Sequence, residues 1–505
     1  MKKNAQKSGF VLILLFLCPL AGSPQTLHES PDTQSKIDSV VNDFRSVWQV
    51  PGIALGIIKD NNIYLKKGYG YADVEKQIPV TSQTLFSIGS STKSFTACGL
   101  AMLADEGKVS WEDPVSRHLP IFRLKNKWAS DSATLIDILS HQTGLAGHGF
   151  MQFSIARQYD RREIVKRLRH LEFSSSFRTE FIYQNQMYQV ATVLLEELSG
   201  KSWETLMEDK LFAPLQMNST TFWGYENRVD SNNFTKRYTY NKEGNMVPTP
   251  PVAPWLQEIS GSGSIYSNVD DLCNWTLFNL NKGTFQNKEL VKEETMNYLH
   301  TPQVVVSREI APGVHMLSHA LGWDIMVYRG HLVVFKPGGF NGVTSQVAFL
   351  PDENIGIILL GNLRSDISYL TMTFSLLDVL LELEPQTWLE MSRPIIENSR
   401  SKIIERKTPD ILENASPPTK DIKDYTGTYQ HHGYGNITIR KKGDQLFADF
   451  ITDSELIHYD QDVFQTNQLL NFIKLKFQKD PNGKITGIVC DFDPDLSGIY
   501  FRKTE

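Results

Sequence analysis

The chain has 505 residues, of which 41% are hydrophobic and 21% are charged, a balance typical of globular proteins that bury a sizeable core. Its 51 basic and 57 acidic residues give a formal net charge of −6. This modest charge, without a basic block, argues against nucleic acid as the main partner. The length is sufficient for two domains.

Residues 1–25 have the three parts of a secretory signal peptide. Lysines at positions 2, 3 and 7 precede an apolar run from Phe10 to Leu17, and small residues follow it. That run is too short for a permanent membrane-spanning helix, and no later apolar run is longer. We therefore expect a protein exported to the bacterial periplasm or secreted, with no permanent membrane span.

Three cysteines, Cys98, Cys273 and Cys490, follow the expected signal peptide. An odd number leaves at least one thiol free, and the wide spacing does not indicate a disulfide framework. Cys98 is most simply a small buried hydrophobic residue. The sequence contains no Cys-x-x-Cys or His-Glu-x-x-His motif, so it predicts neither a metal site nor a cofactor.

Helix and strand patterns are mixed between residues 34 and 385. A period of two residues and the intervening turn KDNN predict a pair of strands near the start of this region, and three short strands are expected near its end. Apolar residues at helical spacing predict three helices, of which the first two end at glycines. The expected strands lie in residues 52–73 and 331–362, and the expected helices in residues 91–107, 182–200 and 365–384.

The C-terminal region has a different pattern. Residues 386–420 are charged and contain several prolines, which is typical of a linker that is partly helical. Residues 421–505 contain about eight strand patterns, with hairpin signals KKGD at 441–444 and DPNG at 480–483. A closed antiparallel barrel would remove exposed strand edges. The sequence HHGYG at 431–435 predicts an exposed turn rather than a metal site.

The stretch FSIGSSTKSFTA, residues 86–97, places Ser90 three residues before Lys93 at an expected helix start. Residues three apart share one face of a helix, and a helix N-terminus favours developing negative charge. A serine with a neutral lysine in reach is therefore a candidate nucleophile with its base. A capped, exposed helix start would give the same short pattern, so other motifs have to decide.

Two later stretches supply further polar groups. Tyr-Gln-Asn at 183–185 opens the expected second long helix, and Lys-Pro-Gly-Gly at 336–339 lies on a glycine-rich strand. Taken alone, Tyr183 is more simply interpreted as a residue of an amphipathic helix. The alternative interpretation of Lys336 is a surface lysine at the end of a strand.

The order Ser-x-x-Lys, Tyr-x-Asn and Lys-x-Gly resembles the class C β-lactamases, DD-peptidases and related esterases. Flanking segments such as VSWEDPVSRHLPIF and GSGSIYSNVDDLCNW are similar too, over about residues 36–380. The resemblance implies an α+β fold: a β-lactamase/transpeptidase-like domain at 34–385, with an antiparallel sheet flanked by helices plus a helical subdomain. Residues 421–505, after a linker at 386–420, resemble a lipocalin-like β-barrel domain.

The resemblance also implies roles for seven residues. The expected nucleophile, base, proton shuttle and amide partner are Ser90, Lys93, Tyr183 and Asn185. The expected substrate-binding and oxyanion residues are Lys336, Gly338 and Gly339, where the N–H groups of Ser90 and Gly339 form the oxyanion hole.

Several physical expectations follow from these roles. Burial and the Lys336 charge should lower the pKa of Lys93, and the two lysines should lower the pKa of Tyr183. His141, in SHQTGL, is expected to be structural. Pro337 departs from the Lys-Thr-Gly or His-Thr-Gly pattern and lacks both a hydroxyl and an N–H, so a substrate carboxylate would lose one donor.

We therefore expect an exported serine hydrolase that forms an acyl-enzyme on Ser90 and acts on small esters, amides or D-amino-acid peptides. Its expected partner is a small-molecule or peptide substrate, and its oligomeric state stays open. Two alternatives remain: a true class C-like β-lactamase, and a catalytically weak ligand-binding protein that retains the fold. The complete set of Ser90, Lys93, Tyr183 and Asn185 argues against the second.

Overall fold

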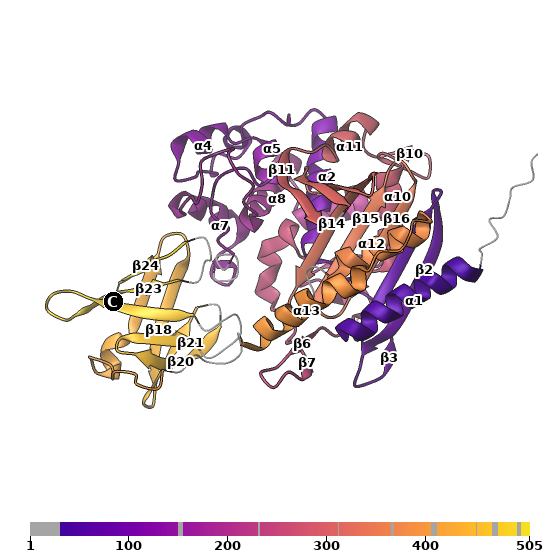
Figure 1. Cartoon of the computed structure of the whole chain (residues 1–505). Helices are drawn as coiled ribbons and strands as arrows, with labels where there is room; N and C mark the ends of the chain where they lie inside the picture. Colours follow the sequence, from indigo (N-terminus) through magenta and orange to yellow (C-terminus); the bar gives the residue numbers. More distant parts are fainter. Residues whose placement is uncertain are drawn as a thin grey trace, which may run out of the picture.

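A computed structural model describes residues 31–149, 155–230, 233–311, 313–364, 368–405, 412–450, 452–466, 473–491 and 496–504. The expected signal peptide lies outside these residues. Among the helices of the described ranges, none is long and apolar enough to cross a membrane. The chain forms a larger part of helices and sheet and a smaller part made of strands (Figure 1).

A nine-stranded antiparallel sheet lies at the centre of the larger part. In spatial order its strands are β11 (Val304–Ala311), β12 (Val314–His319), β13 (Asp324–Tyr328), β14 (His331–Phe340), β15 (Val343–Leu350), β16 (Ile355–Gly361), β1 (Gly52–Lys59), β2 (Asn62–Asp73) and β3 (Ile78–Pro79). The strands expected over residues 52–73 and 331–362 are confirmed. β15 and β16 are buried along their whole length, which explains the continuous apolar sequence of β16.

Helices cover both faces of this sheet. On one face, α1 (Pro31–Trp48), α12 (Ser368–Leu380) and α13 (Trp388–Glu405) pack against one another (Figure 1). On the other face, α10 (Val269–Leu280) packs against β1, β15 and β16. Buried between sheet and helices, the apolar strand residues form two core clusters, one on each side.

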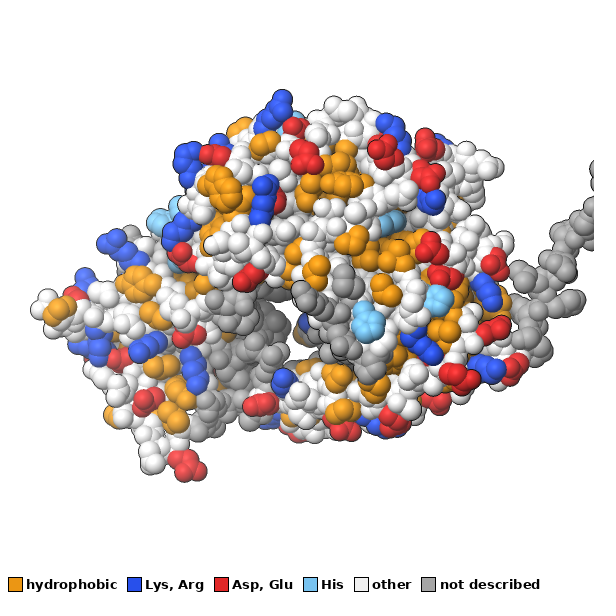
Figure 2. Space-filling model, turned by 45° about the horizontal axis from the view of Figure 1, so that its top comes forward, with side chains coloured by type: hydrophobic (Ala, Val, Ile, Leu, Met, Phe, Trp, Pro, Cys, Tyr) orange, Lys and Arg blue, Asp and Glu red, His pale blue; other side chains and the backbone are white. Residues whose placement is uncertain are grey.

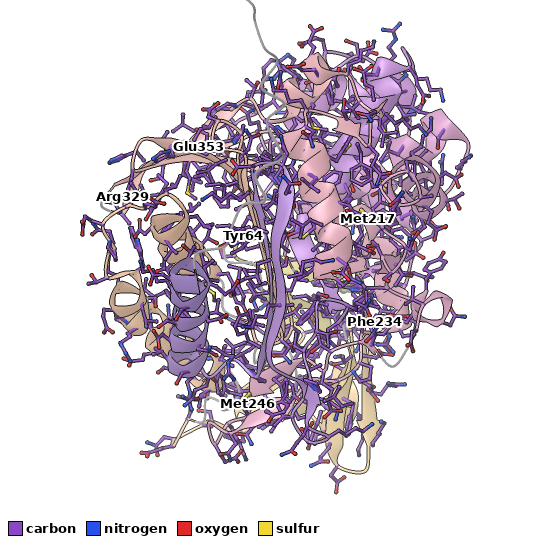
Figure 3. The ribbon with its side chains drawn as sticks, turned by 90° about the vertical axis from the view of Figure 1, so that its right-hand side faces the viewer. Tyr64, Met217, Phe234, Met246, Arg329 and Glu353 are labelled. Carbon is purple, nitrogen blue, oxygen red and sulfur yellow. The ribbon has the colours of Figure 1, made fainter. Side chains whose placement is uncertain are left out.

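Figure 3 shows the sheet nearly edge-on, with a layer of structure on each side. Arg329 and Glu353 lie on the side of α1, and Met217 and Phe234 lie on the opposite side. The α+β architecture expected from the sequence is therefore confirmed as helices, sheet and helices in layers.

The helical subdomain continues the second layer. Its two long helices are α2 (Thr92–Asp105) and α8 (Asn185–Ser199), which pack against each other. The shorter helices of the larger part are α3 (Val115–His118), α4 (Lys127–Ser132), α5 (Leu135–Leu139), α7 (Arg161–Arg167), α9 (Trp203–Met207) and α11 (Glu293–Leu299). α8 ends where Gly200 adopts a φ of +70°, the left-handed C-cap that its sequence predicts.

The three cysteines at 98, 273 and 490 are free thiols, and all are buried. Cys98 lies on α2 with 1% of its surface exposed, and burial raises its thiol pKa. The expectation of a small buried hydrophobic residue at this position is confirmed.

Residues 388–405 form the single helix α13, where we expected a partly helical linker. Trp388 is buried, and its indole N–H donates to the Tyr328 hydroxyl at 3.1 Å. The Trp48 indole N–H donates to Ser392 Oγ at 3.2 Å. Few residues of α13 are buried, so its sequence is mostly polar. The sequence pattern therefore did not indicate a helix that packs on the larger part. The domain boundaries themselves stay predictions.

The smaller part is a closed eight-stranded barrel. Its strands are β17 (Gly427–His431), β18 (Gly435–Lys442), β19 (Gln445–Asp449), β20 (Asp453–Asp460), β21 (Val463–Thr466), β22 (Lys474–Lys479), β23 (Ile485–Cys490) and β24 (Ile499–Lys503). Both expected hairpins are present, between β18 and β19 and between β22 and β23. Acidic and basic side chains are interspersed over the face of the barrel that Figure 2 shows.

The turn at 431–435 joins the barrel to the larger part, so the expectation of an exposed turn was wrong. Tyr434 is only 2% exposed, and its hydroxyl makes a hydrogen bond with His148 Nδ1. Beside it, the amide of Gln158 accepts from Asn436 N at 3.0 Å and donates to Asn436 O at 3.3 Å. The turn is buried by a contact between two domains, which the local sequence does not reveal.

Candidate active site

Ser90 lies in one turn of 3₁₀ helix directly before α2. The preceding residue, Gly89, has a φ of +48°, and a Cβ atom built on it would lie 2.8 Å from Gly339 N. A Cβ on Gly338 would lie 1.9 Å from the Ile88 carbonyl oxygen. Since only glycine fits such approaches, the glycines of β14 let this strand run directly against the serine turn and bring the Gly339 N–H beside it.

The Ser90 hydroxyl contacts two of the expected partners. Lys93 Nζ donates to Ser90 Oγ at 3.2 Å, and the Tyr183 hydroxyl donates to the same oxygen at 2.8 Å. Lys93 Nζ also donates to Asn185 Oδ1 and to the Ser262 carbonyl oxygen, both at 2.7 Å. The structure therefore brings together Ser90, Lys93, Tyr183 and Asn185, which are separated by up to 95 residues in the sequence.

Tyr183 lies in an extended segment before α8, which begins at Asn185. The next residue, Gln184, donates its backbone N–H to His141 Nδ1 at 3.1 Å. The Gln184 side chain accepts from Thr143 Oγ1 at 2.7 Å. His141 is completely buried, so it fixes the backbone that presents Tyr183, as expected of a structural histidine.

The electrostatics around Lys93 favour its neutral form. Lys93 is 0% exposed. Burial, and then the charge of Lys336, lower the pKa of Lys93 well below its ordinary value, while Asp324 acts in the opposite direction. The expected direction of this pKa shift is confirmed, and it follows from the cost of burying a charged amine near a second cation.

The pKa of Tyr183 moves opposite to our expectation. Burial raises it above its ordinary value, the Ser90 hydrogen bond lowers it only in part, and Asp324 raises it further. Although 38% of the residue is exposed, its hydroxyl is engaged with Ser90. Burial disfavours the charged form of Lys93, and Lys336 is paired with a carboxylate, so the two lysines do little to stabilise a phenolate. Tyr183 is therefore a protonated hydrogen-bond donor in the free protein.

Lys336 is buried, with 2% of its surface exposed, so the alternative of a surface lysine was wrong. Its Nζ lies 3.2 Å from Asp324 Oδ2, and Asp324 Oδ1 lies 2.5 Å from His319 Nδ1. The sequence analysis did not identify Asp324 or His319. The three residues come from β14, β13 and β12, so only strand pairing brings them together. One signal was present: Asp324 is a charged residue in the otherwise apolar stretch LGWDIMVY.

Lys336→Met should shift the acidic limb of the kcat/KM profile to higher pH. The variant removes the cation that lowers the pKa of Lys93 and leaves the Asp324 charge, which raises it. The base is active when neutral, so a higher pKa moves the loss of activity to higher pH. Asp324→Asn should shift the limb in the opposite direction. The titratable groups around this site interact, so the acidic limb reports an apparent pKa that belongs to the whole set and not to one residue. These groups are Lys93, Tyr183, Tyr188, His141, His319, Asp324 and Lys336.

A kcat/KM profile measured between about pH 5 and 10 for both variants checks this expectation, over the range of the ordinary side-chain pKa values involved. Limbs that do not move in either variant would mean that the titration of Lys93 does not control the acidic limb.

The barrel contact reaches close to these residues. Gln186, which follows Asn185 in α8, donates from Nε2 to the His148 carbonyl oxygen at 2.7 Å. His148 in turn binds the barrel through Tyr434. A continuous set of contacts therefore joins the barrel to the residue that holds Lys93.

Tyr434→Phe should lower kcat/KM by about three- to tenfold, since it removes one hydrogen bond, of modest net value, from this set of contacts. The barrel itself should stay folded, because the ring is kept. Tyr500→Phe is the matched control: Tyr500 is an exposed barrel tyrosine whose hydroxyl donates to Thr486 O at 3.1 Å. Equal kcat/KM for both variants and the unaltered protein would show that the barrel contact does not influence the site.

Comparisons with known proteins give the family and the fold of the chain. The family model Beta-lactamase matches residues 38–377, and a domain of unknown function, DUF3471, matches residues 413–503. An unguisins hydrolase of Aspergillus campestris is 29% identical over 453 residues, which cover 83% of this chain and 81% of that protein. Protein flp of Staphylococcus aureus strain MW2 is 26% identical over 340 residues, covering 66% of this chain and 64% of flp.

Among solved structures, the octameric penicillin-binding protein homologue from Pyrococcus abyssi has a TM-score of 0.63 at 23% identity. The likeness covers 93% of this chain and 99% of that one, and at this identity it concerns the fold. The Beta-lactamase match spans more than half of the chain and includes Ser90, Lys93, Tyr183 and Lys336. The chain therefore belongs to the beta-lactamase family and has the fold of a serine hydrolase, followed by an eight-stranded barrel.

Proposed function

We propose that the protein is an exported hydrolase that forms an acyl-enzyme on Ser90. One observation carries this proposal: Ser90 Oγ contacts both Lys93 Nζ and the Tyr183 hydroxyl. The pKa of Lys93 is lowered and that of Tyr183 is raised. A neutral amine and a protonated phenol at one oxygen provide a base and an acid for acyl transfer.

In acylation, Ser90 Oγ attacks the carbonyl carbon of the substrate, and its proton passes to Lys93 Nζ. The oxyanion that forms would be held by the N–H groups of Ser90 and Gly339, with the dipole of α2 behind them. As the bond to the leaving group breaks, Tyr183 gives its phenolic proton to that group. The proton on Lys93, whose Nζ lies 5.0 Å from the centre of the Tyr183 ring, then restores the phenol.

In deacylation, water attacks the acyl carbon of the Ser90 ester. Lys93 accepts a proton of this water and then gives it to Ser90 Oγ as the acyl–oxygen bond breaks, so the free acid is released and the starting state is restored. Asn185 keeps Lys93 Nζ in place through its 2.7 Å hydrogen bond and has an amide N–H₂ group that suits a substrate carbonyl.

Small esters, amides and D-amino-acid peptides are the proposed substrates. The name of the Aspergillus campestris relative, an unguisins hydrolase, supports hydrolysis as the reaction class. The leader-like sequence of residues 1–25 supports export to the periplasm or secretion as the location.

A panel of p-nitrophenyl esters, D-Ala peptides and a chromogenic cephalosporin, run on the purified protein, tests this proposal. We expect turnover of esters or peptides that the Ser90→Ala variant lacks. Rapid turnover of the cephalosporin alone would favour the β-lactamase alternative. Binding of these compounds without turnover of any of them would favour the ligand-binding alternative.

A further inference from the structure

The second cation of the site is already paired inside the protein. Lys336 Nζ lies 3.2 Å from Asp324 Oδ2, and the lysine is 2% exposed. A buried amine that has its own carboxylate is compensated, so it has much less attraction for a carboxylate of the substrate. Lys336 therefore does not present a free positive charge beside Ser90.

Asp324 is held firmly in its charged form. Its second oxygen lies 2.5 Å from Nδ1 of the completely buried His319. Burial alone would raise the pKa of Asp324, but Lys336 and then His319 outweigh it and hold this pKa at about 2. At neutral pH the site therefore contains a fixed carboxylate next to Lys336.

The groups around Lys336 add no donor that would replace it. Pro337, the next residue of β14, has no N–H and no hydroxyl. Lys93 donates to Ser90, Asn185 and Ser262. Arg237, near the end of β14, donates its NH1 and NH2 groups to the carbonyls of Asn341 and Pro250. A negative group on the substrate would therefore meet Asp324, while the amines of Lys93 and Lys336 are both engaged with partners inside the protein.

We infer that Asp324 is a specificity-determining residue: by neutralising Lys336, it makes the site select acyl substrates whose leaving group has no carboxylate. Neutral esters and internal or blocked amides belong to this class, and peptides that end in a free carboxylate next to the scissile bond do not. The inference rests on the proposed acyl transfer at Ser90. It concerns the choice of substrate, because the negative charge of Asp324 repels a carboxylate on the leaving group.

Two matched thioesters test the inference: benzoylglycyl thioglycolate, with a free carboxylate on the leaving group, and its methyl ester, which is neutral. Release of thiol is followed for both at one pH, and the ratio of their kcat/KM values is compared. The unaltered protein should prefer the neutral thioester by about tenfold or more, which like-charge repulsion in a buried site readily supplies.

Asp324→Asn should reduce this preference by about tenfold, because the isosteric amide removes the carboxylate that repels a negative leaving group and releases the Lys336 amine from its ion pair. Lys336→Met leaves the Asp324 carboxylate without its cation, so this variant should keep or increase the preference for the neutral thioester. Asp378→Asn is the matched control, since Asp378 is a buried carboxylate that pairs with Arg329 elsewhere on the sheet. It should leave the ratio unchanged. Thermal unfolding checks that each variant is folded.

Equal or faster turnover of the charged thioester by the unaltered protein would overturn the inference, and this result needs no variant. An unchanged ratio in a folded Asp324→Asn variant, or a reduced preference in Lys336→Met, would overturn it as well. A different result would reject the proposed function instead: neither thioester is hydrolysed, or hydrolysis persists in Ser90→Ala.

Discussion

Ser90→Ala should reduce hydrolysis by about 10⁴-fold or more, because the loss of a nucleophile leaves only substrate binding and oxyanion stabilisation. The substitution removes one oxygen and creates little strain, so the protein should stay folded. The measurement is kcat/KM with the best substrate of the panel, together with thermal unfolding of the variant.

Ser94→Ala is the matched control for this experiment. Ser94 lies in α2, which follows the turn that holds Ser90, is buried, and donates its hydroxyl to the Ser91 carbonyl oxygen rather than to Ser90. We expect its activity within a few-fold of the unaltered protein, as for the loss of one ordinary hydrogen bond. Similar activity of Ser90→Ala and Ser94→Ala would place the nucleophile elsewhere.

Lys93→Arg should lower kcat by about 10³-fold, within the range that general base catalysis contributes. A guanidinium keeps its proton at every pH at which the protein is folded, so it cannot accept the proton of Ser90. Lys66→Arg, at a half-exposed lysine that pairs with Asp270, is the control for the substitution itself and should have little effect.

The larger arginine side chain has to fit a fully buried position, so a second variant separates loss of the base from loss of the fold. Lys93→Met removes the amine and keeps an unbranched chain, and it should lose activity to a similar degree while remaining folded. Activity retained in a folded Lys93→Arg protein would contradict the role of Lys93 as base and leave Tyr183 as the candidate.

Local sequence patterns predicted those parts of the site that depend on local structure. Ser90 and Lys93 are three residues apart, so one helical turn brings them together whatever the rest of the fold does. The strands of residues 331–362 follow from short apolar runs separated by turn residues. The meeting of Ser90 with Tyr183 and Asn185 came from the resemblance, because no local pattern brings residues about 90 positions apart into contact.

The remaining parts depend on the pairing of strands and on contacts between distant segments. Asp324, His319 and Lys336 meet because β12, β13 and β14 are neighbours in the sheet. The pKa of Tyr183 was predicted in the wrong direction because the sequence reveals neither the burial of the phenol, which raises this pKa most, nor the nearby charge of Asp324. Tyr434 looked like part of an exposed turn because His148, its partner, lies 286 residues earlier in the chain.

The most direct test of the acyl-enzyme is covalent labelling with a fluorophosphonate probe, followed by intact-mass measurement and peptide mapping. A serine activated by a neutral lysine attacks such a probe and retains it. We predict one adduct per chain, located on Ser90, and no adduct in the Ser90→Ala protein. An adduct on another serine, or labelling that persists in Ser90→Ala, would contradict the account.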